Sequence, residues 1–314
     1  MVRSRGTASG VPATGGQVRI GFGIPQFGAA AAHVDGTMRF AAGAEERGAA
    51  SLWAGDRLLV AVDPTVGYGG GPGGPGSVPE QFTAAHDPLA LLTAAAAVTE
   101  RVQLGTSTLN APWYPAALLA RQAATIDNLS GGRLLLGLGT GWSPEEYDAV
   151  GVPMRERGAR LDETLDLFDA WWHDDPVEFT GRFASVAPSH VHARPQHVPV
   201  YLAGFSPRAR RRIAERADGF LPVVTSDVTD LDAAVSAPWA DLRAAAAEAG
   251  RPADAVGAVL RVNPKPGETA ADAAALVRRV GTDTDVDHAF VDLMYLAEDT
   301  DSALAAVEEI LGAV

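Results

Sequence analysis

The chain has 314 residues, 47% hydrophobic and 20% charged, so it can bury a sizeable core in one large domain or two ordinary ones and is not globally disordered. The formal net charge is −14 and Lys265 is the only lysine, which argues against a general nucleic-acid binder and against a basic membrane-surface protein. The absence of cysteine excludes disulfides, thiolate catalysis, iron–sulfur clusters and cysteine-bound zinc.

The distribution of apolar runs indicates where the protein is located and what its N-terminal segment is. No run approaches the roughly 20 residues of a membrane span. Residues 1–17 contain no apolar segment typical of a secretory signal and are interpreted as a flexible tail. We therefore expect a cytoplasmic protein with neither a membrane nor a nucleic-acid partner.

Strand candidates and helix candidates alternate along the rest of the chain. Apolar runs predict strands at 18–24, 50–54, 102–108, 133–138, 200–203, 219–224, 256–262 and 288–293. Helical spacing and capping residues, among them the N-caps Asp87 and Ser206, predict helices at 33–48, 87–100, 115–129, 153–171, 207–217, 231–250, 270–280 and 302–311. A glycine-rich loop (62–81) follows the second strand, which suggests a lid, a binding loop or disorder. Residues 176–199 have no long period and are interpreted as an insertion with a short hairpin.

This alternation predicts the fold. Strands separated by helices form parallel sheets with crossover connections, and eight such units in about 300 residues match a (β/α)8 TIM barrel with an insertion, in a single domain at 18–314. A doubly wound sheet is the alternative. Its G-x-G-x-x-G fingerprint is not met, because Trp142 stands where the last glycine would be. In a barrel the loops after all strands open onto one face, which holds the active site.

The stretch 132–147 is the strongest local indication of a ligand. An almost wholly apolar strand runs into Gly139, Thr140 and Gly141, where missing side chains let the backbone approach a flat or anionic ligand. Ser143 and Pro144 then indicate a helix N-cap and first position, and helix N-termini bind anions. The alternative is that this turn is only a tight connection.

Several segments together resemble the luciferase-like monooxygenase superfamily, most closely its branch that uses the deazaflavin coenzyme F420. They are Ser-Leu-Trp-Ala-Gly-Asp-Arg-Leu (51–58), Leu-Gly-Thr-Ser-Thr-Leu-Asn (104–110), 115–133, Gly-Leu-Gly-Thr-Gly-Trp (137–142), 152–163 and Pro-Val-Tyr-Leu-Ala-Gly-Phe-Ser-Pro (199–207). They are specific for the superfamily and much less so for the cofactor. The resemblance implies a bacterial-luciferase-like barrel with an insertion near its middle.

The resemblance also implies a cofactor site. The family holds a flavin-type ring over a bulge after the third strand, often with a non-prolyl cis peptide bond, and the matching bond is Ser107–Thr108. An ordinary strand end is the alternative reading. Asp56 stands where the family places a residue near the ring. The remaining cofactor-binding candidates belong to the glycine turn and to the loop for the ribityl-phosphate arm: Gly139, Thr140, Gly141, Ala203, Gly204, Phe205 and Ser206.

The proton donor is the point where this chain departs from the family pattern. Arg57 replaces a histidine common in deazaflavin members, and an arginine can orient or neutralise charge but cannot act as an acid near neutral pH. Trp142 replaces a glutamate found in some members. Asp56, Arg57, Tyr114 and Glu145 are therefore the catalytic candidates, with the proton coming from water, Tyr114 or Glu145. Trp53, Asn110, Trp113 and Trp142 are expected to wall the substrate pocket, and core packing is the less favoured alternative for Trp142.

A run of arginines follows the phosphate loop at Arg208, Arg210, Arg211 and Arg212. One or two of them could meet a cofactor phosphate or the oligoglutamate tail of F420, and a solvated helix face is the alternative. The histidine spacing predicts no metal site, because His190 and His192 lie in the insertion, where a loop role is expected.

The predicted function is that of an oxidoreductase that transfers a hydride between reduced F420 and a small organic substrate. F420 is the preferred cofactor and FMN is second. One alternative is an FMN-dependent monooxygenase that uses O2 and is supplied by a flavin or F420 reductase partner. Another is a non-catalytic flavin-binding protein. A homodimer is expected.

Overall fold

The computed structural model describes residues 18–69, 77–252 and 254–314. The predicted tail (1–17) and part of the predicted glycine-rich loop (62–81) lie outside the described residues. The barrel strands are β1 (Arg19–Gly23), β2 (Ser51–Ala54), β3 (Gln103–Thr106), β4 (Leu109–Asn110), β5 (Leu134–Gly139), β8 (Val200–Leu202), β9 (Gly219–Phe220), β10 (Val223–Thr225), β11 (Gly257–Ala258), β12 (Leu260–Asn263) and β13 (His288–Val291). They lie within a few residues of the eight predicted strands.

These segments close into one parallel barrel. The hydrogen-bonded order is β10-β12-β13-β1-β2-β3-β5-β8-β9-β11, with β4 paired to β5. Three barrel strands are interrupted and appear as the pairs β3/β4, β9/β10 and β11/β12. Because β9 pairs with β11 while β10 pairs with β12, the two ends of this order are the same two barrel strands, and the ring is closed. Pro222 marks one interruption, since proline has no N–H to donate to a ladder. The predicted TIM barrel is confirmed.

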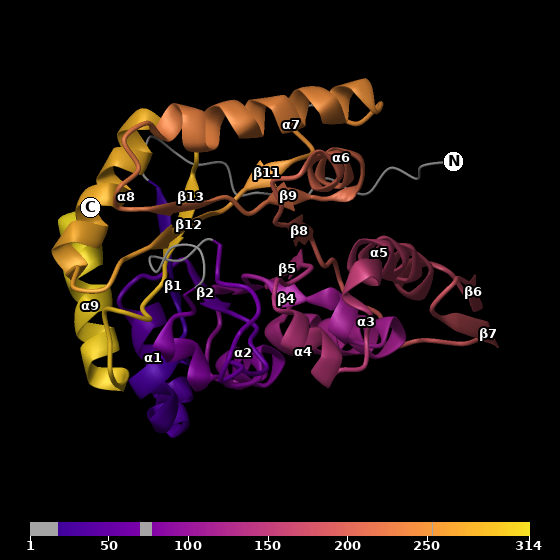
Figure 1. The fold of residues 1–314 in the computed structure, drawn as a ribbon, viewed down its shortest axis with the longest axis horizontal. Helices are drawn as coiled ribbons and strands as arrows, with labels where there is room; N and C mark the ends of the chain where they lie inside the picture. Colours follow the sequence, from indigo (N-terminus) through magenta and orange to yellow (C-terminus); the bar gives the residue numbers. More distant parts are fainter. Residues whose placement is uncertain (1–17, 70–76, 253) are drawn as a thin grey trace.

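Helices cover the outside of the barrel (Figure 1). They are α1 (Thr37–Glu46), α2 (Pro88–Ala96), α3 (Ala116–Ser130), α4 (Pro144–Ala149), α5 (Arg157–His173), α6 (Pro207–Arg216), α7 (Ala237–Glu248), α8 (Ala270–Asp283) and α9 (Thr300–Ala313). Predicted N-caps are confirmed where Asp87, Ser143 and Ser206 accept hydrogen bonds from the backbone N–H three residues on.

Three predicted helices are divided in the structure. The first is a 3-10 segment (Gly28–Gly36) followed by α1, and the fourth begins with a 3-10 segment (Met154–Glu156) before α5. The sixth is a π-helical segment (Asp232–Ser236) followed by α7. The predicted insertion contains the expected hairpin, with β6 (Val177–Thr180) antiparallel to β7 (Ser185–Ser189). It projects beyond α5, away from the barrel (Figure 1). No helix of the described residues is long and apolar enough to cross a membrane.

The barrel interior is filled by large side chains that lie against glycines. Trp53 stacks on Phe290 with ring centroids 4.7 Å apart, and the two belong to a small interior cluster separate from the larger core under the helices. A Cβ at Gly105 would lie 2.4 Å from the Trp53 ring, and one at Gly219 would lie 2.0 Å from the Tyr201 ring. Trp53 is only 2% exposed, so the predicted pocket wall is first of all part of the interior core.

Candidate active site at the barrel mouth

The loops singled out from the sequence meet at one end of the barrel. Asp56 follows β2, Ser107 follows β3, Gly139 ends β5 and Gly204 follows β8. These strands are parallel and belong to one closed ring, so their carboxyl ends share one mouth. The expectation that the four residues lie at the same end of the barrel is confirmed.

The third barrel strand is interrupted by the expected bulge. The Ser107–Thr108 peptide bond is cis, as the resemblance implied, and the chain then re-enters the sheet as β4. The Thr106 hydroxyl donates to the Gly137 carbonyl at 2.7 Å beside it. A Cβ at Gly139 would lie 2.4 Å from Thr108 Oγ1. Gly139 therefore makes room for the side chain of the bulge, a role in protein packing that the sequence did not reveal.

Asp56 is the centre of a polar cluster under the mouth. Its carboxylate accepts a hydrogen bond from the Asn110 N–H at 2.8 Å and lies 3.4 Å from the Tyr114 hydroxyl, which donates to it. The Asn110 side-chain amide donates to the Asp56 carbonyl at 3.2 Å. Burial raises the pKa of Asp56 to about 6, and the hydrogen bond from Asn110 offsets only part of that effect. The structure thus brings together three predicted site residues, and one of them titrates near neutral pH.

Arg57 is committed to a buried ion pair that the sequence did not predict. Its guanidinium binds both carboxylate oxygens of Glu146 on α4, and the Leu58 N–H donates to the same carboxylate at 2.8 Å. The Arg57 side chain is 7% exposed and that of Glu146 is 0% exposed. The guanidinium also lies 4.7 Å from the centre of the Trp142 ring. Arg57 therefore fastens the loop after β2 to the helix after β5.

Glu145 is a poor proton donor, contrary to its place among the catalytic candidates. Its carboxylate accepts from the Thr65 N–H at 2.8 Å and from the Thr65 and Ser143 hydroxyls. These bonds lower the pKa of Glu145 to about 2, so it carries no proton near neutral pH. Tyr114 is a weak acid here as well, because burial and the nearby Asp56 carboxylate raise its pKa.

The glycine turn after β5 is shaped by its neighbours. Gly141 has φ +63°, a backbone conformation that favours glycine, and a Cβ there would lie 3.0 Å from Asn110 Oδ1. The carbonyl of Thr140 accepts from the buried Tyr147 hydroxyl. Trp113 and Trp142 each have a buried indole Nε1 with no partner among the described residues. Trp142 is half-buried beside Tyr68, with ring centroids 5.5 Å apart, and does not lie in the packed core.

The predicted phosphate loop opens on the same mouth. The Ala203 N–H donates to the Leu138 carbonyl at 3.2 Å, which ties the start of this loop to β5. Gly204 has φ +154°, and a Cβ there would lie 2.5 Å from that of Ala209. Phe205 is 66% exposed, and Ser206 caps α6. The first N–H groups of a helix have no partner within it, so this loop could hold an anion.

Three arginines of the predicted cationic run on α6 are already paired with aspartates. Arg208 and Arg212 both bind Asp162 on α5, and Arg210 binds Asp241 on α7 at 2.9 Å. Arg212 is buried. The interpretation that some of them meet a cofactor tail is not supported for these three, because each already joins α6 to a neighbouring helix.

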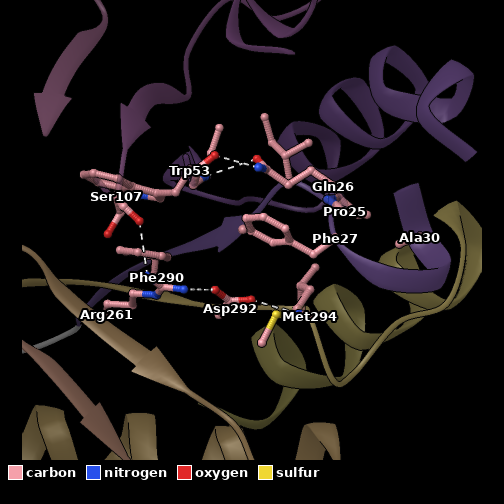
Figure 2. A pocket seen from close by; sticks show the side chains of 15 residues that line it. Pro25, Gln26, Phe27, Ala30, Trp53, Ser107, Arg261, Phe290, Asp292 and Met294 are labelled. Carbon is pink, nitrogen blue, oxygen red and sulfur yellow. Dashed lines mark hydrogen bonds and ion pairs between the residues drawn. The ribbon is translucent and has the colours of Figure 1, made fainter. Parts of the chain in front are cut away.

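A pocket at the mouth contains charged residues that sequence reasoning missed. Arg261 on β12 and Asp292 after β13 form an ion pair there, and the Arg261 guanidinium also donates to the Ser107 carbonyl at 3.2 Å (Figure 2). The buried Gln26 side chain donates to the Gly55 carbonyl at 2.6 Å and accepts from its N–H. A charged residue at the carboxyl end of an apolar barrel strand is a functional signal, and it was present in the sequence.

Sequence comparisons agree with the expected family. The family described as luciferase-like monooxygenase matches residues 18–309. An F420-dependent glucose-6-phosphate dehydrogenase of Amycolatopsis mediterranei is 33% identical over 191 residues, which cover 59% of this chain and 52% of that protein. An uncharacterised protein of Mycobacterium tuberculosis is 38% identical over 133 residues, covering 42% of this chain and 46% of the relative. The chain thus spans about half the length of the curated relatives it matches.

Solved structures share the fold at low sequence identity. The monooxygenase RslO1 of Streptomyces bottropensis superposes with a TM-score of 0.74 at 18% identity, covering 95% of this chain and 98% of the other. An F420-dependent secondary alcohol dehydrogenase in complex with an F420–acetone adduct gives 0.70 at 16% identity, covering 95% and 99%. At this identity the likeness concerns the fold.

Proposed function

Because the chain belongs to the luciferase-like monooxygenase family, we propose that it is an oxidoreductase that binds coenzyme F420 at the barrel mouth and exchanges a hydride with a small organic substrate. The observation that carries the proposal is the meeting, at one mouth, of the bulge after β3, the glycine turn after β5 and the loop before α6. The F420-dependent relatives at 33% and 35% identity support F420 over FMN as the preferred cofactor.

The residues present suit a flat ring with a phosphate arm. The bulge at Ser107–Thr108 and the turn at Gly139–Gly141 would lie against the ring. The buried indole N–H groups of Trp113 and Trp142 have no partner among the described residues, and oxygen and nitrogen acceptors of a ring would satisfy them. Ala203–Ser206 and the start of α6 would hold the phosphate.

The coenzyme supplies the hydride chemistry when bound, and the protein binds, orients and excludes water. In this proposal Asp56 holds the proton, because its pKa of about 6 leaves it partly protonated near neutral pH. Tyr114 and Asn110 orient its carboxylate through the bonds described above. Arg57 acts indirectly, since its pair with Glu146 holds the loop that carries Asp56. Water is the remaining source of the proton.

An FMN-dependent monooxygenase is the second candidate, with reduced flavin supplied by a reductase partner. Its support is the superposition on monooxygenases, among them RslO1. A non-catalytic flavin-binding protein is the third, because Arg57 and Trp142 replace the proton-transferring residues of the family pattern.

Anaerobic titration of the coenzyme-free protein separates these candidates. F420 and FMN are titrated in parallel, each in its oxidised and its reduced form, and followed by absorbance. The oxidised complexes are then exposed to alcohols, and the reduced complexes to ketones or O2. We expect F420 to bind more tightly than FMN, and the F420 absorbance to change as the coenzyme is reduced by an alcohol or oxidised by a ketone. Tighter binding of FMN with O2 consumption would favour the monooxygenase, and binding without turnover the non-catalytic protein.

A tryptophan pair tests the site itself. Trp142→Phe removes one indole N–H at the mouth while keeping an aromatic ring. Trp239→Phe is the matched control, because Trp239 lies on the outer helix α7 and its Nε1 donates to the Val256 carbonyl. We expect Trp142→Phe to weaken F420 binding by about two- to tenfold, the range of one neutral hydrogen bond, and the control to leave it unchanged. Equal affinities in both variants would remove Trp142 from the cofactor site.

A further inference from the structure

The mouth has a second side, away from the predicted cofactor loops. The predicted cofactor residues follow β3, β5 and β8, whereas the pocket is formed by the ends of β1, β2, β12 and β13. Figure 2 shows Phe27, Met294, Arg261 and Asp292 facing this space, with Trp53 and Phe290 beside it. Ser107 is common to both sides. A second hollow adjoins it and is lined by Tyr68, Phe82, Asn263 and Tyr295, together with Arg261, Asp292 and Met294.

Arg261 is held in one orientation between these hollows. One terminal nitrogen donates to the Ser107 carbonyl at 3.2 Å, and the other binds Asp292. Asp292 is fixed in turn, because its second oxygen accepts from the Met294 N–H at 2.8 Å. The guanidinium is therefore positioned by two separate segments, the one after β3 and the one after β13, before any ligand arrives.

Two buried polar atoms in this place have no partner among the described residues. They are Nε of Arg261 and Oδ1 of Asn263. Both side chains belong to β12 and are two residues apart, so they project from the same face of the strand. Buried polar groups in native proteins almost always have a hydrogen-bond partner. The unpaired Arg261 Nε–H beside a hollow therefore indicates that a ligand supplies its acceptor.

We propose that this pocket binds the substrate, a neutral organic molecule whose carbonyl or hydroxyl oxygen accepts a hydrogen bond from Arg261 Nε; this assignment rests on the proposed function. The charges decide the class. Among the described residues, Arg261 and Asp292 are the only charged ones that line either hollow, and they neutralise each other. An anion buried here would have no uncompensated cation to balance it, whereas a neutral oxygen needs none.

The rest of the lining suits the hydrocarbon part of such a molecule. Phe27, Phe82 and Met294 offer apolar surface around the polar pair. The Asn263 side chain, which lines the second hollow, offers a second polar contact. The same guanidinium contacts the Ser107 carbonyl, so the bound oxygen and the carbon that carries it would lie near the bulge that the proposed function assigns to the coenzyme ring. Hydride exchange requires that carbon to be near the ring.

Met294 makes this site directly observable. The chain has four methionines, and Met294 is the one that lines the pocket, whereas Met38 is half exposed on α1 and Met154 lies before α5. Coenzyme-free protein labelled with carbon-13 at the methionine methyls is titrated with butanone and, separately, with propionate. These two probes have nearly the same shape and differ in charge. We expect butanone to shift the Met294 signal saturably while the Met38 and Met154 signals stay fixed, and propionate to give no saturable shift.

Arg261→Lys tests the donor, because lysine can still pair with Asp292 but has no Nε–H in a planar fork. Arg210→Lys is the matched control at an exposed pair on α6. The dissociation constant for butanone should rise by about tenfold or more in Arg261→Lys, as expected for loss of a charged hydrogen bond, and stay unchanged in the control. Asn263→Ala keeps the ion pair and should also weaken butanone binding. This second variant tests the pocket even if Arg261→Lys fails to fold.

Three results would overturn the inference: no saturable Met294 shift with butanone, an equal response to propionate, or unchanged binding in both pocket variants. The measurement needs no coenzyme, so it fails independently of the proposed function. A Met294 response in a protein that does not bind F420 would support the substrate pocket and contradict F420 as the coenzyme.

Discussion

The buried pair between Arg57 and Glu146 allows a quantitative test of how the mouth is assembled. Arg57→Met leaves the Glu146 carboxylate, which is 0% exposed, with only the backbone N–H groups of Leu58 and Leu59 as partners. Removing one member of a buried ion pair costs about 3–5 kcal/mol, because the other charge stays desolvated without compensation. Burial lowers the pKa of Arg57 only to about 10, so the guanidinium is charged at neutral pH.

The expected change in thermal stability follows from the size of the chain. An unfolding entropy of about 2.1 cal/mol/K per residue over 314 residues gives a shift of about 1.5 °C per kcal/mol, hence a loss of about 5–8 °C for Arg57→Met. The double variant Arg57→Met/Glu146→Gln removes both charges while keeping an oxygen acceptor for the Leu58 N–H. It should recover most of the loss, since buried pairs are often replaceable by neutral groups at little net cost.

The assay is a double-mutant cycle measured by denaturant and thermal unfolding. Arg210→Met, which breaks the exposed pair with Asp241, is the control and should change stability by no more than about 1 kcal/mol. Coenzyme binding should weaken with the single variant, because the Arg57 guanidinium also supports Trp142. A loss below about 1 kcal/mol in Arg57→Met, or a double variant as unstable as the sum of the singles, would refute a buried and coupled pair.

Three further predictions concern the site and the barrel interior. Burial raises the pKa of Asp56 to about 6, so the folded protein binds this proton more tightly than the unfolded chain and loses stability as the pH rises from about 4 to about 6. Asp56→Asn should therefore be more stable than the parent above pH 7, by up to about 3 kcal/mol. Urea unfolding at a series of pH values should show this gain vanishing near pH 4. Gly141→Val should destabilise the fold by about 1–2 kcal/mol because φ is +63°, and an unaltered melting temperature would contradict that backbone geometry. Gly219→Ala should cost about 1–3 kcal/mol in calorimetry because its Cβ would lie 2.0 Å from the Tyr201 ring, whereas Gly312→Ala, with open space around it, should be neutral or slightly stabilising.

Much of the fold was predictable because local signals agreed with one another. Each apolar strand run is followed by a turn and a capped helix, and the caps at Asp87, Ser143 and Ser206 form as expected. The limits of this reasoning appear where one helix is not continuous. The segment 231–250 has uniform helical composition, yet its first turn is π-helical, and composition alone does not distinguish these hydrogen-bond patterns.

The candidate site was predictable as a set of loops and less so as a set of interactions. Strand order places the ends of β2, β3, β5 and β8 together, so the positions of Asp56, Ser107, Gly139 and Gly204 followed from topology. The interpretation of the α6 arginines was unsupported for a different reason. Their aspartate partners lie on α5 and α7, and which helices neighbour α6 is known only when the barrel is assembled.

The sequence by itself determined the alternating strand and helix units, the barrel, the family and the loops that form its mouth, because these depend on periodicity, capping and short motifs within a few residues of one another. Only the tertiary structure decided that Arg57 is neutralised by Glu146, 89 residues away, and that Arg261 meets both Asp292 and the Ser107 carbonyl, 154 residues away. These contacts depend on the register with which the ring closes. Burial and charge pairing arise from that closure, so the chemical state of each mouth residue is a property of the closed barrel.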